Sequence, residues 1–190
     1  YAYMYGLPYE YYDKYHIRRY GAHGTSHQFV AKKGAEMVGL DLNNSRIITC
    51  HIGNGSSITA IVNGKSIDTS MGLTPLEGLV MGTRCGDVDA NAVLYMMKKE
   101  NLTPDQMYDI VNKKSGFLGV SQKTSDAREL DELANNGDRQ AKLVLKMLTF
   151  QMIKYIGAYT AEMNGVDAIF FTGGIGEHNS RLRRRVCENF

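Results

Sequence analysis

Apolar side chains change their spacing early in the chain. Over residues 25–40 they recur at near-helical intervals behind a Thr-Ser pair that can cap a helix, which predicts an amphipathic helix. The spacing then becomes that of strands, with β-branched runs over 46–52, 57–62 and 65–68. Asn63-Gly64, between the last two runs, is the residue pair favoured in a type I′ hairpin turn. We therefore expect one helix followed by three consecutive antiparallel strands.

The rest of the chain is patterned mainly for helices. Periodicity and capping residues predict helices over 89–99, from Thr103 onward, over 126–134 and over 138–163. An apolar run over 168–172 predicts a buried strand, and residues 173–177 predict a glycine-rich loop. A last helix is expected from about residue 179. This order of elements predicts a mixed α/β architecture.

Composition and charge narrow the classes of function. The chain has 190 residues, of which 43% are hydrophobic and 22% charged, and this suits one globular domain. The net charge of +2 gives no reason to expect nucleic-acid binding. We interpret the one basic cluster, Arg181 with Arg183, Arg184 and Arg185, as a solvated helix face. No run approaches the about 18 apolar residues that a membrane helix needs.

Cysteine usage and the N-terminal residues indicate the compartment. Cys50, Cys85 and Cys187 are widely spaced and have no C-x-x-C partner, so the sequence supports neither a disulfide framework nor a zinc site. A reducing cytoplasm fits this pattern best. Residues 1–15 are aromatic and interrupted by polar side chains, unlike a signal peptide. Because the chain begins without methionine, we expect a fragment or a processed piece of a longer protein.

Two glycine-rich segments have the composition of phosphate-binding loops. Residues 53–57 join two predicted strands, and their amides can form an anion-binding nest, although taken alone a plain hairpin loop is favoured. Residues 173–176 lie between an apolar strand and a helix, where a nucleotide loop and a tight structural turn are equally favoured. Neither the G-x-G-x-x-G fingerprint nor the Walker pattern occurs there.

Histidine and arginine side chains supply further candidates. His23 and His27 stand four apart at the start of a predicted helix, where they could be a metal pair, a polar cap or a catalytic donor; satisfied structural histidines are favoured. Arg84 lies in a glycine-containing loop and could clamp a carboxylate or a phosphoryl group bidentately. The alternative for Arg84 is a surface salt bridge to Asp87 or Asp89.

These segments occur together in one order, and in this combination the chain resembles the acetate kinases of the sugar-kinase, Hsp70 and actin superfamily. The matching motifs are residues 18–27, 51–57, 74–78, 81–86, 112–116 and 171–177. The resemblance implies an actin-like ATPase domain of the ribonuclease H-like type, with a mixed sheet and flanking helices. It also implies reversible transfer of the γ-phosphate of ATP to the carboxylate of acetate, giving acetyl phosphate and ADP.

The resemblance assigns roles to individual residues. His23 would donate to the phosphoryl group in transfer, and Arg84 would bind that group and the acceptor carboxylate. Pro75 and Ala22 match the acyl pocket, and Ala22 stands where the family usually has phenylalanine. The matches to the nucleotide site are Asn54 and Gly55 at the terminal phosphates, Asp126 and Arg128 at the adenosine, and Gly174, Ile175 and Gly176 against the adenine and the phosphates. Phosphoryl transfer depends on such positioning and positive charge more than on covalent chemistry.

The family pattern extends past both ends of these residues. Its N-terminal domain brings a catalytic aspartate, a second arginine and an asparagine-serine phosphate loop, and a glutamate near the metal lies beyond Phe190. The resemblance therefore implies that residues 1–190 are a C-terminal nucleotide-binding and dimerisation domain, with the Mg²⁺ ligands outside it and none assigned within it. Alone, this chain should bind ATP or ADP but transfer phosphate poorly. A homodimer in the cytoplasm is expected.

Other functions remain open at this point. A propionate or butyrate kinase is a close alternative within the same enzyme class, since these enzymes differ from acetate kinase only in which short carboxylic acid accepts the phosphate. A non-catalytic nucleotide switch of the actin or Hsp70 kind would use the same domain, but it has no need for His23 together with Arg84. A Rossmann oxidoreductase is disfavoured by the hairpin meander and by the missing G-x-G-x-x-G motif.

Overall fold

A mixed four-stranded sheet lies at the centre of the computed structural model, which describes residues 1–190. The sheet order is β3-β2-β1-β4, with strands β1 (Arg46–Ile52), β2 (Ser56–Val62), β3 (Lys65–Thr69) and β4 (Ala168–Thr172). The first three strands pair antiparallel in sequence order, as predicted, with a bulge at Ala60/Ile61. β4 joins the edge of β1 in parallel, and the intervening helices make the crossover.

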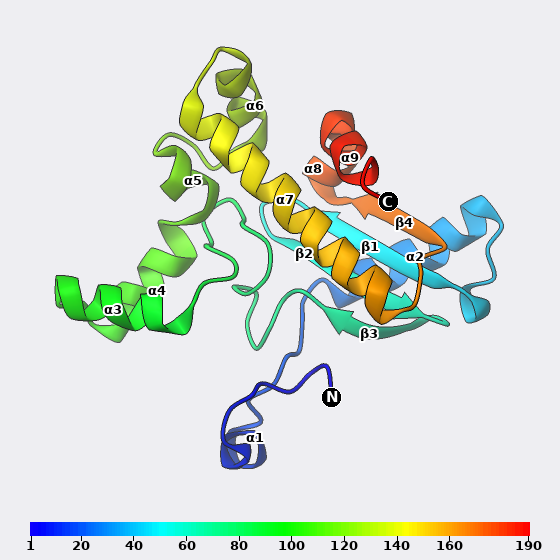
Figure 1. Cartoon of the computed structure of the whole chain (residues 1–190), viewed down its shortest axis with the longest axis horizontal. Helices are drawn as coiled ribbons and strands as arrows, with labels where there is room; N and C mark the ends of the chain where they lie inside the picture. Colours follow the sequence, from blue (N-terminus) through cyan, green and yellow to red (C-terminus); the bar gives the residue numbers. More distant parts are fainter.

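Helices cover both faces of this sheet. α2 (Gly24–Val38) packs on one face, and the long α7 (Arg139–Glu162) crosses the other (Figure 1). Because side chains alternate along a strand, Ile47 packs with Ala31 and Ala35 of α2, while Ile48 joins the larger core under α7. These two apolar layers fix the sheet between the helices. The apolar side chains that predicted α2 do not form its buried face, because Phe29, Met37 and Val38 are 67%, 77% and 58% exposed.

The remaining helices are short and lie mostly to one side of the sheet. They are α1 (Tyr9–Tyr15), α3 (Ala90–Glu100), α4 (Pro104–Lys113), α5 (Gly116–Ser121), α6 (Ala127–Asn135), α8 (Gly173–His178), α9 (Ser180–Cys187) and a 3₁₀ turn at Leu42–Asn44. In Figure 1, α3 to α6 gather beyond one end of α7, and α1 hangs away from the sheet. No helix combines the length and the apolar character needed to cross a membrane.

Side-chain caps explain why the predicted helices begin where they do. Asp89 accepts from the amide of Asn91 to start α3, and Thr103 forms a full capping box with Gln106 at α4. Asp126 and Asp138 cap α6 and α7 in the same way. Each of these helices begins within one residue of the start that the sequence predicted. The capping chemistry is therefore readable from the sequence.

The glycine-rich loop predicted over residues 173–177 is wrong. The chain enters α8 directly from β4, and Gly173 makes the sharp turn with φ of 78°. A side chain there would place Cβ 2.6 Å from the carbonyl oxygen of Ile52, so the turn needs glycine. The sequence pattern also missed α1, which buries no residue, and α5, which is too short to show a period.

The core under α7 should dominate stability. Leu148 is 2% exposed, and Leu148→Ala should lower the free energy of unfolding by about 2–5 kcal/mol because it leaves a cavity. Leu94 of α3 is 60% exposed, so Leu94→Ala should change it by less than about 0.5 kcal/mol. Urea unfolding of both variants measures the difference; equal losses would mean that the core is not where the packing places it.

Candidate functional site

Two histidines of the α2 segment reach the sheet through hydroxyl groups. His27 Nε2 and His23 Nδ1 both contact Ser57 Oγ, at 2.7 and 2.8 Å, and His27 Nδ1 contacts Thr49 Oγ1 at 2.7 Å. Alternation along β1 and β2 puts Thr49 and Ser57 on the face that α2 covers. His23 itself caps the helix in a left-handed conformation, with φ of 63°. The local fold thus fixes the ring of His23.

His51 of β1 completes this histidine cluster, although the sequence did not single it out. Its Nδ1 contacts Ser26 Oγ at 2.8 Å, and its ring stacks on His23 with centroids 4.0 Å apart. The available signal was its position in β1: it lies two residues after Thr49, so it faces α2 as well. The stacked ring limits how His23 can rotate.

Burial keeps the cluster uncharged near neutral pH. Desolvation, followed by the nearby His51 and Arg84, lowers the pKa of His23 to about 4. Burial, with smaller effects of His23 and His51, lowers the pKa of His27 to about 4. Both nitrogens of His27 are already in hydrogen bonds, so His27 has no free nitrogen for the metal-binding alternative.

Arg84 and His23 converge on the turn between β1 and β2. A Cβ placed on Gly55 would lie 3.3 Å from Arg84 Nη1 and 3.5 Å from His23 Nε2. Next to it, Gly82 donates its amide to the carbonyl of Asn54 at 3.2 Å, and a Cβ on Gly82 would lie 1.9 Å from Asn54 Oδ1. The structure therefore brings four of the predicted residues together: His23, Asn54, Gly55 and Arg84.

Arg84 is not held by a salt bridge. Its Nη1 donates to the carbonyl of Pro75 at 3.3 Å, which brings that predicted acyl-pocket residue beside it. The salt bridge to Asp87 or Asp89 that the sequence offered as an alternative is absent; Asp87 instead accepts from Tyr155 and from the amide of Gly78. Most donors of the guanidinium are thus free for an anion.

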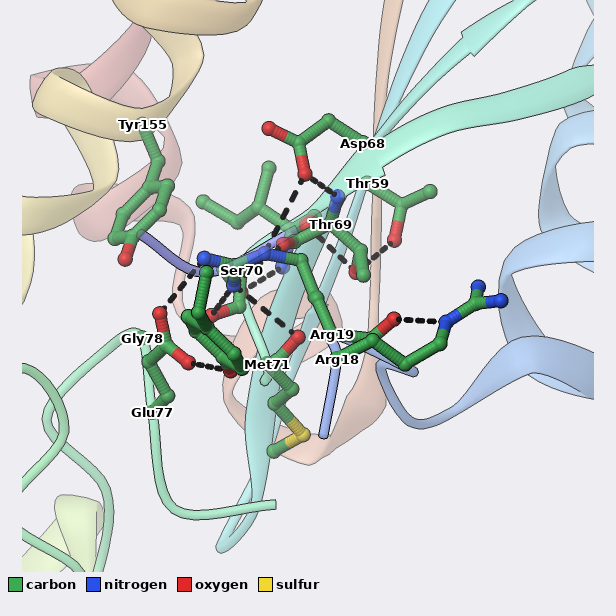
Figure 2. Close-up of polar contacts among 12 residues, drawn as sticks. Arg18, Arg19, Thr59, Asp68, Thr69, Ser70, Met71, Glu77, Gly78 and Tyr155 are labelled. Carbon is green, nitrogen blue, oxygen red and sulfur yellow. Dashed lines mark hydrogen bonds and ion pairs between the residues drawn. The ribbon is translucent and has the colours of Figure 1, made fainter. Parts of the chain in front are cut away.

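A second arginine ties the segment before His23 to the loop that holds Pro75. Arg19 donates from Nη1 to the carbonyls of Thr69, Ser70 and Met71 at 3.1–3.3 Å, and from Nη2 to Glu77 at 2.7 Å (Figure 2). Tyr5 also donates to Glu77. Figure 2 shows these groups meeting at the end of β3. The contacts fix where the two segments lie relative to each other. Arg19 belongs to the motif over residues 18–27, but the sequence did not predict this role for it.

A polar cavity of about 930 Å³ opens beside Asn54. It contains five of the residues assigned to the nucleotide: Asn54, Asp126, Arg128, Gly174 and Ile175. It also contains residues that the sequence analysis did not assign: Ser125, Asp131, His178, Asn179, Ser180 and Arg181. The helix start predicted near residue 179 could have indicated Asn179, Ser180 and Arg181, because a helix N-terminus favours anions. The cavity has the size of a ligand site.

Six predicted residues lie outside this cavity: Ala22, His23, Gly55, Pro75, Arg84 and Gly176. Gly55 faces His23 and Arg84 instead, and Gly176 is buried against β1 in α8, where a Cβ would lie 3.6 Å from the carbonyl of Cys50. Ala22 is half-buried, and its carbonyl lies 3.5 Å from Ser57 Oγ. Ala22 thus lies beside the hydroxyl that His23 contacts, and Pro75 lies beside Arg84.

An exposed ion pair lies at the rim of the cavity. Asp126 caps α6 and accepts from Arg128 Nη2 at 2.7 Å, and this hydrogen bond lowers the pKa of Asp126 to about 2. The Arg128 side chain is 89% exposed, and exposed pairs contribute little to stability. The guanidinium can therefore turn to a ligand at small cost.

Together these groups have the chemistry that binding a phosphorylated ligand requires. The polar cavity can hold the body of the ligand, while the β1–β2 turn, a neutral histidine donor and an arginine face its anionic end. Glycine at 55 leaves space next to His23 and Arg84, and glycine at 82 lets its loop pack closely on Asn54. No group of three His, Cys, Asp or Glu side chains is arranged to hold a metal ion.

Comparison with known proteins identifies relatives over the whole chain. Residues 1–190 match the model of the acetokinase family. The acetate kinase of Thermosipho africanus (strain TCF52B) is 56% identical over 190 residues, which are 100% of this chain and 47% of that protein. The chain therefore spans about half the length of this relative.

Solved structures agree with this match. The crystal structure of Porphyromonas gingivalis acetate kinase superposes with a TM-score of 0.97 at 49% identity, over 100% of this chain and 47% of that one. The crystal structure of a propionate kinase from Francisella tularensis gives a TM-score of 0.93 at 43% identity, over 98% and 48%. The mixed α/β fold with flanking helices is confirmed.

The buried histidine predicts how stability depends on pH. The pKa of His27 is about 4 in the folded chain, whereas that of an ordinary exposed histidine is 6.5, so the unfolded chain binds more protons between these values. The free energy of unfolding should be highest above about pH 6.5 and fall as the pH is lowered toward 4. Urea unfolding at pH 7 and pH 5 measures this slope. In His27→Gln the slope should be smaller; an unchanged slope would assign the effect to other groups.

Proposed function

This chain belongs to the acetokinase family, and from that premise we propose that it provides the nucleotide side of an acetate kinase active site. The observation that carries the proposal is the meeting of His23 Nε2 and Arg84 Nη1 at Gly55, beside a polar cavity of about 930 Å³. The proposed reaction is reversible transfer of the γ-phosphate of ATP to the carboxylate of acetate. The activity is proposed for the protein that contains these residues.

The nucleotide is placed along the cavity. Asp126 and Arg128 flank the adenosine, with Gly174, Ile175 and Gly176 of α8 opposite them. Because Gly176 is itself buried, its proposed role is to set the position of the α8 backbone. The phosphates then run toward Asn54 and Gly55, because the β1–β2 turn connects the cavity to His23 and Arg84. This direction brings the terminal phosphate to the two candidate catalytic groups.

At the transfer end, two groups share the developing charge. Arg84 can bind the acceptor carboxylate and an equatorial phosphoryl oxygen with separate N–H donors. His23, neutral at pH 7 because its pKa is about 4, can donate one hydrogen bond without carrying charge. Such preorganised donors are most effective where water is excluded. A pure nucleotide switch would have no use for this pair.

The acid is proposed to bind between Ala22 and Pro75. Propionate is the second candidate acid, favoured by the small side chain of Ala22 and by the 43% identity to a propionate kinase. Butyrate would need still more space. A short-chain carboxylate is thus the proposed substrate class, with acetate first because the acetate kinases are the relatives at 56% and 49% identity.

Magnesium is expected with the nucleotide but not through a site formed here. Mg²⁺ is usually bound by one or two carboxylates together with substrate phosphates. These residues form no cluster of three potential metal-binding side chains, so they do not fit a metal site by themselves. We propose that ATP or ADP brings Mg²⁺ and that its protein ligands lie outside residues 1–190.

We further propose that these residues are a C-terminal nucleotide-binding and dimerisation domain of a cytoplasmic enzyme. The apolar side chains Leu143 and Phe150 of α7 are 50% and 68% exposed, beyond the stripe that packs on the sheet. A second copy of the chain can cover them. The family membership and the free cysteines Cys50, Cys85 and Cys187 support a cytoplasmic location.

The nucleotide site predicts a specific effect of Gly82→Ala. The new methyl would lie 1.9 Å from Asn54 Oδ1 and must displace that exposed side chain, so binding of ATP should weaken about tenfold. Gly24→Ala is the control, because no atom lies within 4 Å of its Cβ position. Calorimetry with ATP, ADP and NAD measures this. A folded chain that binds no adenine nucleotide at millimolar concentration would exclude the assignment.

The reaction is tested by trapping acyl phosphate as a hydroxamate. We expect turnover from a chain extended at both ends by the segments that its relatives carry, and little from the 190 residues alone, because one side of a cleft cannot align donor and acceptor. Ala22→Phe in the extended chain should raise the preference for acetate over propionate about fourfold, the effect of one buried methylene. Comparable turnover without the extensions would contradict the assigned roles.

The oligomeric state is a separate prediction. Light scattering at micromolar concentration should report twice the chain mass of 21.2 kDa. Phe150→Glu should give monomers, since it places a charge in the proposed contact, whereas Leu94→Glu on the exposed face of α3 should leave the dimer intact. A monomeric unmodified chain would remove α7 from the proposal.

A further inference from the structure

The hydrogen-bonding groups behind His23 are joined end to end. Thr49, His27, Ser57 and His23 form one line from the covered face of β1 to the turn at Gly55, with contacts of 2.7, 2.7 and 2.8 Å. Thr49 and Ser57 are fully buried, and His27 is 4% exposed. Solvent therefore does not reach Thr49, His27 or Ser57, and the side chains themselves determine which atom donates at each contact.

Counting hydrogens leaves two orders in which the donors all point the same way along the line. Each of the four side chains has one hydrogen to donate, because both imidazoles are neutral at pH 7. Three contacts use three of these hydrogens. The fourth then lies at one end of the line: on His23 Nε2 if every donor points outward, or on Thr49 Oγ1 if every donor points inward. The two orders give His23 opposite tautomers.

The buried end of the line favours the outward order. Thr49 Oγ1 has a single hydrogen-bonding contact, with His27 Nδ1. In the inward order, His27 Nδ1 donates to Thr49 Oγ1, so the hydroxyl hydrogen of Thr49 is buried without an acceptor. This cost shifts the equilibrium between the two orders about tenfold toward the outward one. In a third order, Ser57 accepts from both imidazoles and donates to the carbonyl of Ala22. That order is disfavoured because the carbonyl oxygen is 3.5 Å away, at the long limit of a hydrogen bond.

We propose that Thr49, His27 and Ser57 are positioning residues that hold His23 with its hydrogen on Nε2, the nitrogen next to Arg84 Nη1 and Gly55. The opposite tautomer would direct a lone pair toward an anion bound there. A phosphoryl oxygen only accepts hydrogen bonds, so the outward order is the one that a phosphate ligand needs. The identity of that anion rests on the proposed function, whereas the order of hydrogens does not.

The tautomer can be read directly by NMR. In the chain labelled with ¹⁵N-histidine at pH 7, long-range ¹H–¹⁵N spectra distinguish a protonated ring nitrogen from an unprotonated one. We expect Nε2 of His23 and Nε2 of His27 to be protonated and both Nδ1 atoms to be unprotonated. Protonation of His23 at Nδ1 in the majority form would overturn the proposal.

Matched variants separate this effect from a general loss of structure. Thr49→Val removes the hydroxyl at the buried end, and the share of His23 protonated at Nδ1 should rise at least threefold. Thr49→Ser keeps the hydroxyl and should keep the tautomer. Ser26→Ala is the control, since Ser26 contacts His51 and not the line. A Val variant whose His23 spectrum equals that of the Ser variant would contradict the role of Thr49.

A kinetic measurement connects the tautomer to transfer. In the chain extended at both ends, Ser57→Ala should lower kcat at least fivefold and leave KM for ATP unchanged, because Ser57 contacts His23 and not the cavity. Unchanged kcat would overturn the positioning role. If the extended chain forms no acyl phosphate at all, the proposed function fails, while the spectra still decide the order of hydrogens.

Discussion

The antiparallel register of β1 with β2 is the constraint on which the site depends. It places His51 opposite Ser57 and Thr49 opposite Thr59, so the hydroxyl and imidazole groups of both strands share one face. A shift by one residue would turn these groups into the apolar core under α7. Isoleucines at the intervening positions prevent that shift, because Ile48 and Ile58 are completely buried on the other face. The same alternation therefore forms the core and orients the polar cluster.

From this register, α2 brings the remaining groups into place. Its inner positions Ala31 and Ala35 pack against Ile47 and Ile61, and this fixes the height of the helix above the sheet. One turn nearer its start, the inward position is His27, which meets hydroxyls instead of methyl groups. The helix thus changes from apolar to polar packing along a single face. His23, at the cap, ends up at the edge of the sheet, where a ligand can reach it.

Loops from distant parts of the sequence then complete the site, and each is held by charge or by glycine. Arg19 fastens the end of β3 and the loop of Glu77 to the segment that leads to His23. Gly82 lets its loop pack directly on Asn54, and Gly173 lets α8 begin at the end of β4. These contacts require glycine at two positions and a guanidinium at a third. They explain how a cavity forms between segments that are far apart in the chain.

The sequence by itself determined the meander, the starts of the capped helices and most of the candidate residues. Strand periodicity, the Asn63-Gly64 turn and capping residues such as Thr103 act locally, so neighbouring residues suffice to predict them. Only the tertiary structure decided that residues 173–177 are helical, that His51 joins His23, and that Arg84 contacts Pro75 rather than an aspartate. These outcomes depend on which surfaces meet in space, and the spacing of residues along one segment does not contain that information.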